Sequence, residues 1–110
     1  MTNWFIRAEI VRRVDNDPQP GIVECRFDDA NGRTWSFLGK YDKFTDKNLW
    51  SDSIYPQPGY LACEIVSRRT DEHGCQLAEV ETSRIKLTLG HESMDGHSRF
   101  TLLAEQLEYR

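Results

Sequence analysis

The sequence contains few of the residues on which disulfide cross-linking, metal binding and nucleophilic catalysis usually depend. There are three cysteines and three histidines in 110 residues, and no two cysteines have the Cys-x-x-Cys spacing. An odd number of cysteines without a paired motif argues against a disulfide framework and against a structural zinc site. We therefore expect Cys25, Cys63 and Cys75 to be buried, unoxidised thiols.

Long apolar runs and an excess of positive charge are also missing. No window approaches the roughly 20 apolar residues of a membrane-spanning helix, and the first residues lack the apolar core of a signal peptide. The 14 basic residues are outnumbered by 18 acidic ones, and the net charge of -4 is spread over both halves of the chain. A nucleic-acid-binding surface would need a basic face. We therefore expect a cytoplasmic protein that binds neither membrane nor nucleic acid.

The composition is that of one folded domain spanning residues 1–110. Hydrophobic residues make up 38% of the chain and aromatic residues 11%, with charges of both signs interspersed. A chain of this length buries roughly two-thirds of its unfolded surface, which is enough for a single core.

The clearest structural signal is a β-hairpin between Ile22 and Leu38. Val23, Cys25 and Phe27 alternate with polar residues before the Asp-Asp-Ala-Asn-Gly turn, and Trp35 and Phe37 alternate after it. A two-residue loop would place the two apolar sets on opposite faces of the sheet. We therefore predict a three-residue loop, residues 30–32, with Gly32 left-handed and Phe27 opposite Trp35.

Further strands are predicted at a spacing of about ten residues, with almost no helical periodicity. A second hairpin is predicted around a two-residue Asp95-Gly96 loop, which places Leu89 opposite Leu102. Six or seven strands joined by hairpin turns predict an all-β domain, a small antiparallel β-barrel with a β-sandwich as the alternative. The remaining strands are expected at 3–12, 60–69, 76–82, 85–91 and 99–104.

The long connection from Gly39 to Gly59 is the best candidate for a binding surface. It is too long for a structureless loop in a compact domain, and Thr45 is a candidate cap for one helical turn within it. Aromatic and cationic side chains on a loop suit a protein interface, although the same rings could instead cover one open end of the barrel as ordinary core. The candidate partner-binding residues are Tyr41, Lys43, Phe44, Lys47, Trp50 and Tyr55.

The sequence gives little indication of a catalytic or metal-binding site. His73, His91 and His97 lack ligand spacing, and we expect them in turns or at the edge of the core. Cys25 and Cys63 lie on apolar strand faces, where thiols are normally inert. Glu64 is expected on the solvent face of its strand, or equally paired across the sheet with Arg7, Arg26 or Arg84. We predict no catalytic residues, no metal and no cofactor.

The run Tyr-Pro-Gln-Pro-Gly-Tyr-Leu-Ala-Cys-Glu-Ile-Val, residues 55–66, resembles the Pro-Gly-then-strand element of β-barrel domains of elongation factor Tu type. With the preceding hairpin, the similarity in order covers about half of the chain. It implies a barrel that acts as a docking module. GTPase activity is not implied, because the chain has no Walker-type glycine-rich loop. In length and general sequence character the chain also resembles small bacterial proteins.

Three functions are compatible with these observations. The first is a non-catalytic module that docks onto a protein partner through residues 39–59. The second is an immunity-type inhibitor of a basic toxin, because the chain is small and acidic. The third is an enzyme or small-ligand-binding protein that uses the interior or mouth of the barrel.

Overall fold

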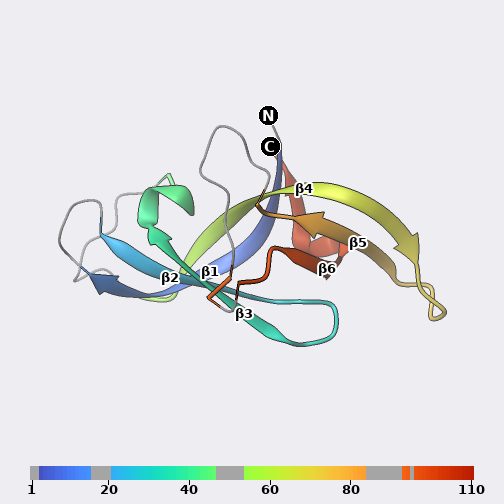
Figure 1. Ribbon diagram of the computed structural model, residues 1–110, viewed down its shortest axis with the longest axis horizontal. Helices are drawn as coiled ribbons and strands as arrows, with labels where there is room; N and C mark the ends of the chain where they lie inside the picture. The colour runs from blue at the N-terminus through green and yellow to red at the C-terminus, as the bar shows by residue number, and fades with distance from the viewer. Residues whose placement is uncertain (1–2, 16–20, 47–53, 84–92, 95) are drawn as a thin grey trace.

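The computed structural model describes residues 3–15, 21–46, 54–83, 93–94 and 96–110 (Figure 1). Two short 3-10 helices, η1 (Tyr41–Lys43) and η2 (Ala104–Gln106), accompany the strands. None of the described helices has the length and hydropathy needed to cross a bilayer. The strands are β1 (Trp4–Asp15), β2 (Ile22–Asp28), β3 (Thr34–Lys40), β4 (Gln57–Thr70), β5 (Gln76–Glu81), β6 (Arg99–Leu103) and β7 (Leu107–Tyr109).

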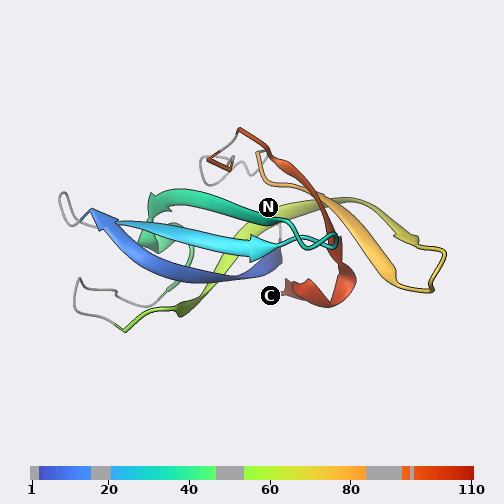
Figure 2. The same cartoon turned by 90° about the horizontal axis from the view of Figure 1, so that it is seen from below.

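The strands form one antiparallel sheet in the order β3-β2-β1-β4-β5-β6, with β7 also paired to β1. β4 links the two halves, because its first part pairs with β1 and its second part pairs with β5. The sheet curls on itself into a half-barrel, so that the β2–β3 hairpin comes to lie beside β6 (Figure 2). The predicted all-β antiparallel architecture is therefore confirmed.

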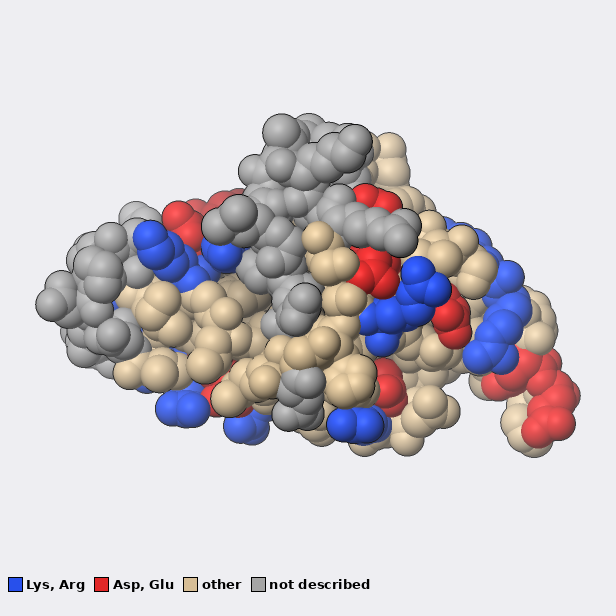
Figure 3. Space-filling view, in the orientation of Figure 1, with Lys and Arg blue, Asp and Glu red and all other residues tan. Residues whose placement is uncertain are grey.

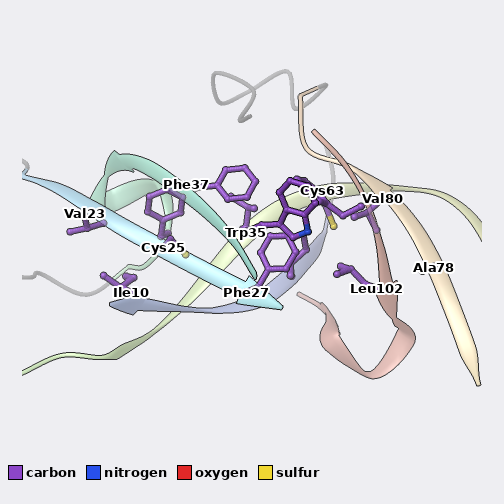
Figure 4. Close-up of a cluster of buried hydrophobic side chains, with 14 residues drawn as sticks. Ile10, Val23, Cys25, Phe27, Trp35, Phe37, Cys63, Ala78, Val80 and Leu102 are labelled. Atoms are coloured by element: carbon purple, nitrogen blue, oxygen red, sulfur yellow. The ribbon is translucent and has the colours of Figure 1, made fainter. Parts of the chain in front are cut away.

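Phe100 of β6 joins the two halves of the core. Its ring lies 5.2 Å from Phe27, 5.0 Å from Trp35 and 5.8 Å from Phe37, measured between ring centroids. Edge-to-face contacts at such distances are favourable beyond the area they bury. The aromatic residues of β2 and β3 point toward Val80 and Leu102 of the other half (Figure 4). The core therefore lies inside the curl of the sheet.

Backbone hydrogen bonds close the curl beside this aromatic cluster. The Ala30 N–H donates to the Thr101 carbonyl at 2.9 Å, and the Met94 N–H donates to the Ser36 carbonyl at 2.8 Å. The Gln106 side chain adds a bond of 2.6 Å to the Asp28 carbonyl. The tip of the β2–β3 hairpin and the Ser36 carbonyl on its outer edge are thus bonded, which satisfies polar groups that an open sheet would leave at its edge.

The first hairpin has the predicted register. Phe27 pairs with Trp35 and Cys25 with Phe37, and Gly32 is left-handed with φ +82°. The Asp29 carboxylate accepts bonds from the backbone N–H groups of residues 31 and 33, which fixes the loop.

The second predicted hairpin differs at its turn. Ser93 pairs with His97 through a bond of 2.7 Å from the Ser93 N–H, so three residues rather than two separate the paired positions. The Ser93 hydroxyl also accepts a bond from the His97 N–H at 3.0 Å, which favours the longer loop. The arm expected at 85–91, with Leu89, lies outside the described residues.

Candidate functional site

The segment after β3 folds back onto β4 and positions the predicted binding region. Lys40 leaves the strand in an extended conformation, and η1 follows immediately. The Tyr41 N–H donates to Gly21 at 3.1 Å, and the Tyr60 N–H donates to the Phe44 carbonyl at 2.7 Å. Backbone bonds therefore tie this segment to the sheet at both ends.

Phe44 anchors the segment in the core. Its side chain is only 1% exposed. The ring packs over Gly39, where a Cβ would meet it at 3.2 Å, and its carbonyl lies near Gly59. Glycine at position 39 lets the Phe44 ring approach the sheet closely, whereas the tight contact at Gly59 is with Ile10, which a Cβ would meet at 2.9 Å. Phe44 is thus part of the core, so the candidate binding surface has to be formed by its neighbours.

A surface hollow of about 230 Å³ lies beside η1. We call it the η1 hollow. Its residues come from β1, the η1 segment, β4 and the end of the chain after β7, which are distant in sequence. They are Phe5, Asp42, Lys43, Phe44, Thr45, Asp46, Tyr60 and Arg110.

Arg110 and Tyr60 form the most specific contact in the η1 hollow. The Arg110 guanidinium carbon lies 3.7 Å from the centroid of the Tyr60 ring. The same guanidinium donates to the Glu108 carboxylate at 2.5 Å. This hydrogen bond raises the pKa of Arg110, and the charges of Tyr60, Glu108 and Asp46 act in the same direction. A cation held over an aromatic face by a carboxylate is a preorganised contact surface.

The structure brings together only part of the predicted partner-binding set. Lys43 and Phe44 line the η1 hollow. Tyr41 and Tyr55 are half-buried and pack against the core. Lys47 and Trp50 lie outside the described residues, as does most of the turn expected after Thr45, whereas the helical turn that is described comes earlier, in η1.

Phe5, Tyr60 and Arg110 of the η1 hollow lie outside the 39–59 connection that the sequence analysis singled out. Phe5 and Tyr60 lie on neighbouring strands, where Phe5 pairs with Ala62 and Arg7 with Tyr60. Arg110 reaches the hollow because β7 pairs with the first residues of β1. The local sequence indicated this contact only through the two-residue spacing of Glu108 and Arg110, which places both side chains on the same face of an extended strand.

A larger hollow of about 450 Å³ lies where β2 and β7 separate along β1. β7 pairs with β1 up to Ile6, and β2 pairs with it from Glu9 onward. Charged side chains of both signs line this hollow, among them Arg7, Glu9, Arg26 and Asp28. The Asp28 carboxylate already accepts a hydrogen bond from the Thr34 hydroxyl at 2.6 Å, and the Arg26 guanidinium donates to the Glu24 carboxylate at 2.6 Å.

The cysteine and histidine side chains differ in their surroundings. Burial raises the pKa of both Cys25 and Cys63 to about 12, with the Glu64 charge contributing at Cys63. Cys75 is exposed, contrary to the expectation of a buried thiol, because it lies at the end of the β4–β5 turn.

His73 is exposed, and the His97 ring lies 4.8 Å from the Trp35 ring. His91 lies outside the described residues. Among the described residues, no group of acidic, histidine and cysteine side chains could hold a metal ion.

Glu64 forms no ion pair with Arg7 or Arg26, two of the three arginines considered as its partners, and the third, Arg84, lies outside the described residues. The register places it opposite Glu81, and within the described part of the chain it forms no ion pair. Arg26 instead pairs with Glu24. The register of β1 and β4 places Arg7 opposite Tyr60 rather than Glu64, and Arg26 lies on β2, which does not neighbour β4 in the sheet.

Comparison of the chain with protein-family models, with curated proteins and with solved structures found no match.

Proposed function

We propose that this chain is a non-catalytic protein-interaction domain that docks onto a protein partner through the η1 hollow. The observation that carries the proposal is the Arg110 guanidinium stacked 3.7 Å over Tyr60, beside Phe5 and Lys43. Arginine, tyrosine and other aromatic residues dominate the binding energy of many protein interfaces.

The charges around the η1 hollow suit a polar rim. Two acidic residues, Asp42 and Asp46, and two basic ones, Lys43 and Arg110, line the hollow together with its aromatic residues. Such a rim orients a partner and sets the association rate, while buried aromatic contacts supply most of the affinity. Because η1 is bonded to the sheet at both ends, little ordering would be needed on binding.

The packing of the core favours a surface function over a ligand site inside the curl. The core side chains of both halves are at most 7% exposed and contact one another across the interior (Figure 4). The resemblance of residues 55–66 to elongation factor Tu-type barrels, which act as docking modules, supports the same proposal.

The proposal is tested by capture of a partner from the native cell with immobilised protein. The double variant Lys43→Glu/Arg110→Glu reverses two cations of the rim, and we expect it to lose a partner that the wild type retains. Its melting temperature should stay near that of the wild type, because Lys43 is only partly buried and Arg110 is exposed. Equal capture by wild type and variant would refute the η1 hollow as the docking site.

A further inference from the structure

β4 has a free edge in its second half. The strand runs for 14 residues, but β1 pairs only with its first part, up to Cys63. β5 pairs with Glu64–Thr70 on the opposite edge, since β4 lies between β1 and β5 in the sheet. Along Val66–Thr70, no strand in the described part of the chain pairs with the edge on the β1 side. Backbone donors and acceptors on such an edge are open to another chain.

The free edge is exposed and held in place. All five side chains from Val66 to Thr70 are exposed, and Val66 is 45% exposed. β5 and β6 support the strand from the other side, and the Asp71 carboxylate fixes the turn through bonds to the N–H groups of residues 73 and 75. The β4–β5 hairpin projects beyond the body of the molecule (Figure 1). A partner strand would therefore meet a preformed template.

Two arginines give this edge its charge. Arg68 and Arg69 are adjacent, so their side chains point to opposite faces of the sheet. The Arg68 guanidinium lies 5.1 Å from the Trp4 ring, near the point where β1 begins, and Arg69 is opposite Leu77. Basic side chains follow the upper margin of the projecting hairpin, with acidic ones at its tip (Figure 3).

We propose that the Val66–Thr70 edge binds an extended acidic segment of a partner protein by strand addition. Backbone hydrogen bonds to β4 would supply affinity, and an acidic pair opposite Arg68 and Arg69 would supply specificity. Trp4 and Tyr109, whose rings are 5.2 Å apart, offer an apolar contact at the inner end of the site. Tyr109 is 63% exposed and therefore accessible.

Charge complementarity selects this occupant over a second copy of the chain. In an antiparallel pairing of two β4 edges, the arginines of the two copies would face one another, and like charges directly opposite destabilise a sheet. Charged edge residues commonly block such self-pairing. An acidic strand turns the same two charges into an attraction. This site is separate from the η1 hollow, so the two proposals can fail independently.

The test uses two short synthetic peptides with blocked ends, followed by amide NMR and hydrogen exchange on the full chain. One peptide has a central Glu-Glu pair flanked by valine and threonine, and the other has Lys-Lys in its place. We expect the acidic peptide to shift the amide signals of Val66–Thr70 and slow their exchange at millimolar concentration. The basic peptide should leave both unchanged.

Charge reversal provides the decisive comparison. In Arg68→Glu/Arg69→Glu the preference should invert, with the acidic peptide weakened roughly tenfold or more. Lys40→Glu, an exposed charge reversal on β3, should keep the wild-type preference. If the double variant does not fold, Arg69→Gln alone should still weaken the acidic peptide, because Arg69 is exposed. No slowing of exchange with either peptide, or a preference unaltered by these changes, would overturn the proposal.

Discussion

At the scale of single residues, two buried carboxylates are each held by one donor two residues along the chain and by donors from a neighbouring segment. Glu24 is 3% exposed and accepts bonds of 2.6 Å from both Arg12 and Arg26. Burial opposes its ionisation, but these bonds outweigh the burial and lower its pKa. Glu81 accepts bonds of 2.5 Å from Ser83 and from Ser98, and these bonds, with Arg99, lower its pKa to about 2. Both groups stabilise the fold in their charged form.

Glu81→Gln should lower the free energy of unfolding at neutral pH by about 1–3 kcal/mol, because a charged acceptor with several donors is lost. The folded-state pKa of Glu81 is below its ordinary value of 4.5, so its contribution is complete above that pH and is lost as the pH falls toward 2. Urea unfolding across this range should therefore show a steeper loss for the wild type than for the variant. Parallel curves would contradict the role given to Glu81.

The thiols provide a second check at this scale. Burial holds Cys25 and Cys63 in the neutral form, whereas Cys75 is exposed. Because the thiolate is the reactive species, a disulfide reagent should modify Cys75 alone in the native protein and all three cysteines in urea. Rapid native modification of Cys25 or Cys63, located by mass spectrometry, would show that the core opens more readily than this packing implies.

At the scale of elements, three turns share one construction. Each begins with an aspartate or serine and has a left-handed glycine three residues later: Asp29 with Gly32, Asp71 with Gly74, and Ser93 with Gly96. In each turn the glycine N–H donates to the carbonyl of the first residue, and the first side chain accepts from the backbone four residues on. These local rules made the Ile22–Leu38 register predictable, and applying them at Ser93 would also have given the three-residue loop.

Gly74 isolates the contribution of the left-handed conformation. Its φ is +84°, and nothing lies within 4 Å of the position that a Cβ would occupy. Gly74→Ala should therefore cost about 1–2 kcal/mol through backbone strain alone. Gly74→Asn should cost less, because asparagine tolerates this conformation. Equal stabilities of wild type and Gly74→Ala in urea unfolding would contradict the explanation.

At the scale of the whole molecule, long-range pairing decides what the sequence pattern leaves open. The alternation of apolar residues predicted β1 to β6 and the core face of β1, with Ile6 and Ile10 fully buried, but it did not predict β7. It did not predict that β1 pairs with three strands, nor that Phe100 joins the two halves. The η1 hollow depends on these pairings, because Phe5, Tyr60 and Arg110 meet only when β4 and β7 lie beside β1. Lys43 could be predicted from the local sequence because it directly precedes the buried Phe44.

The distribution of surface charge favours docking through small, specific sites over attraction through a broad surface of one charge. The molecule measures 46 × 27 × 27 Å, and acidic and basic side chains are interspersed over the described part of the face shown in Figure 3. A partner would therefore be selected by local geometry more than by net charge.

The most direct test of the docking claim compares two arginines with similar surroundings. Arg110 lies 3.7 Å over Tyr60 in the η1 hollow, and Arg33 lies 4.0 Å over Trp35 at the tip of the β2–β3 hairpin. The measurement is the dissociation constant of the captured partner for wild type, Arg110→Ala and Arg33→Ala. We predict that Arg110→Ala weakens binding by about tenfold or more while Arg33→Ala leaves it unchanged. Equal affinities for wild type and Arg110→Ala, or a loss confined to Arg33→Ala, would contradict the account.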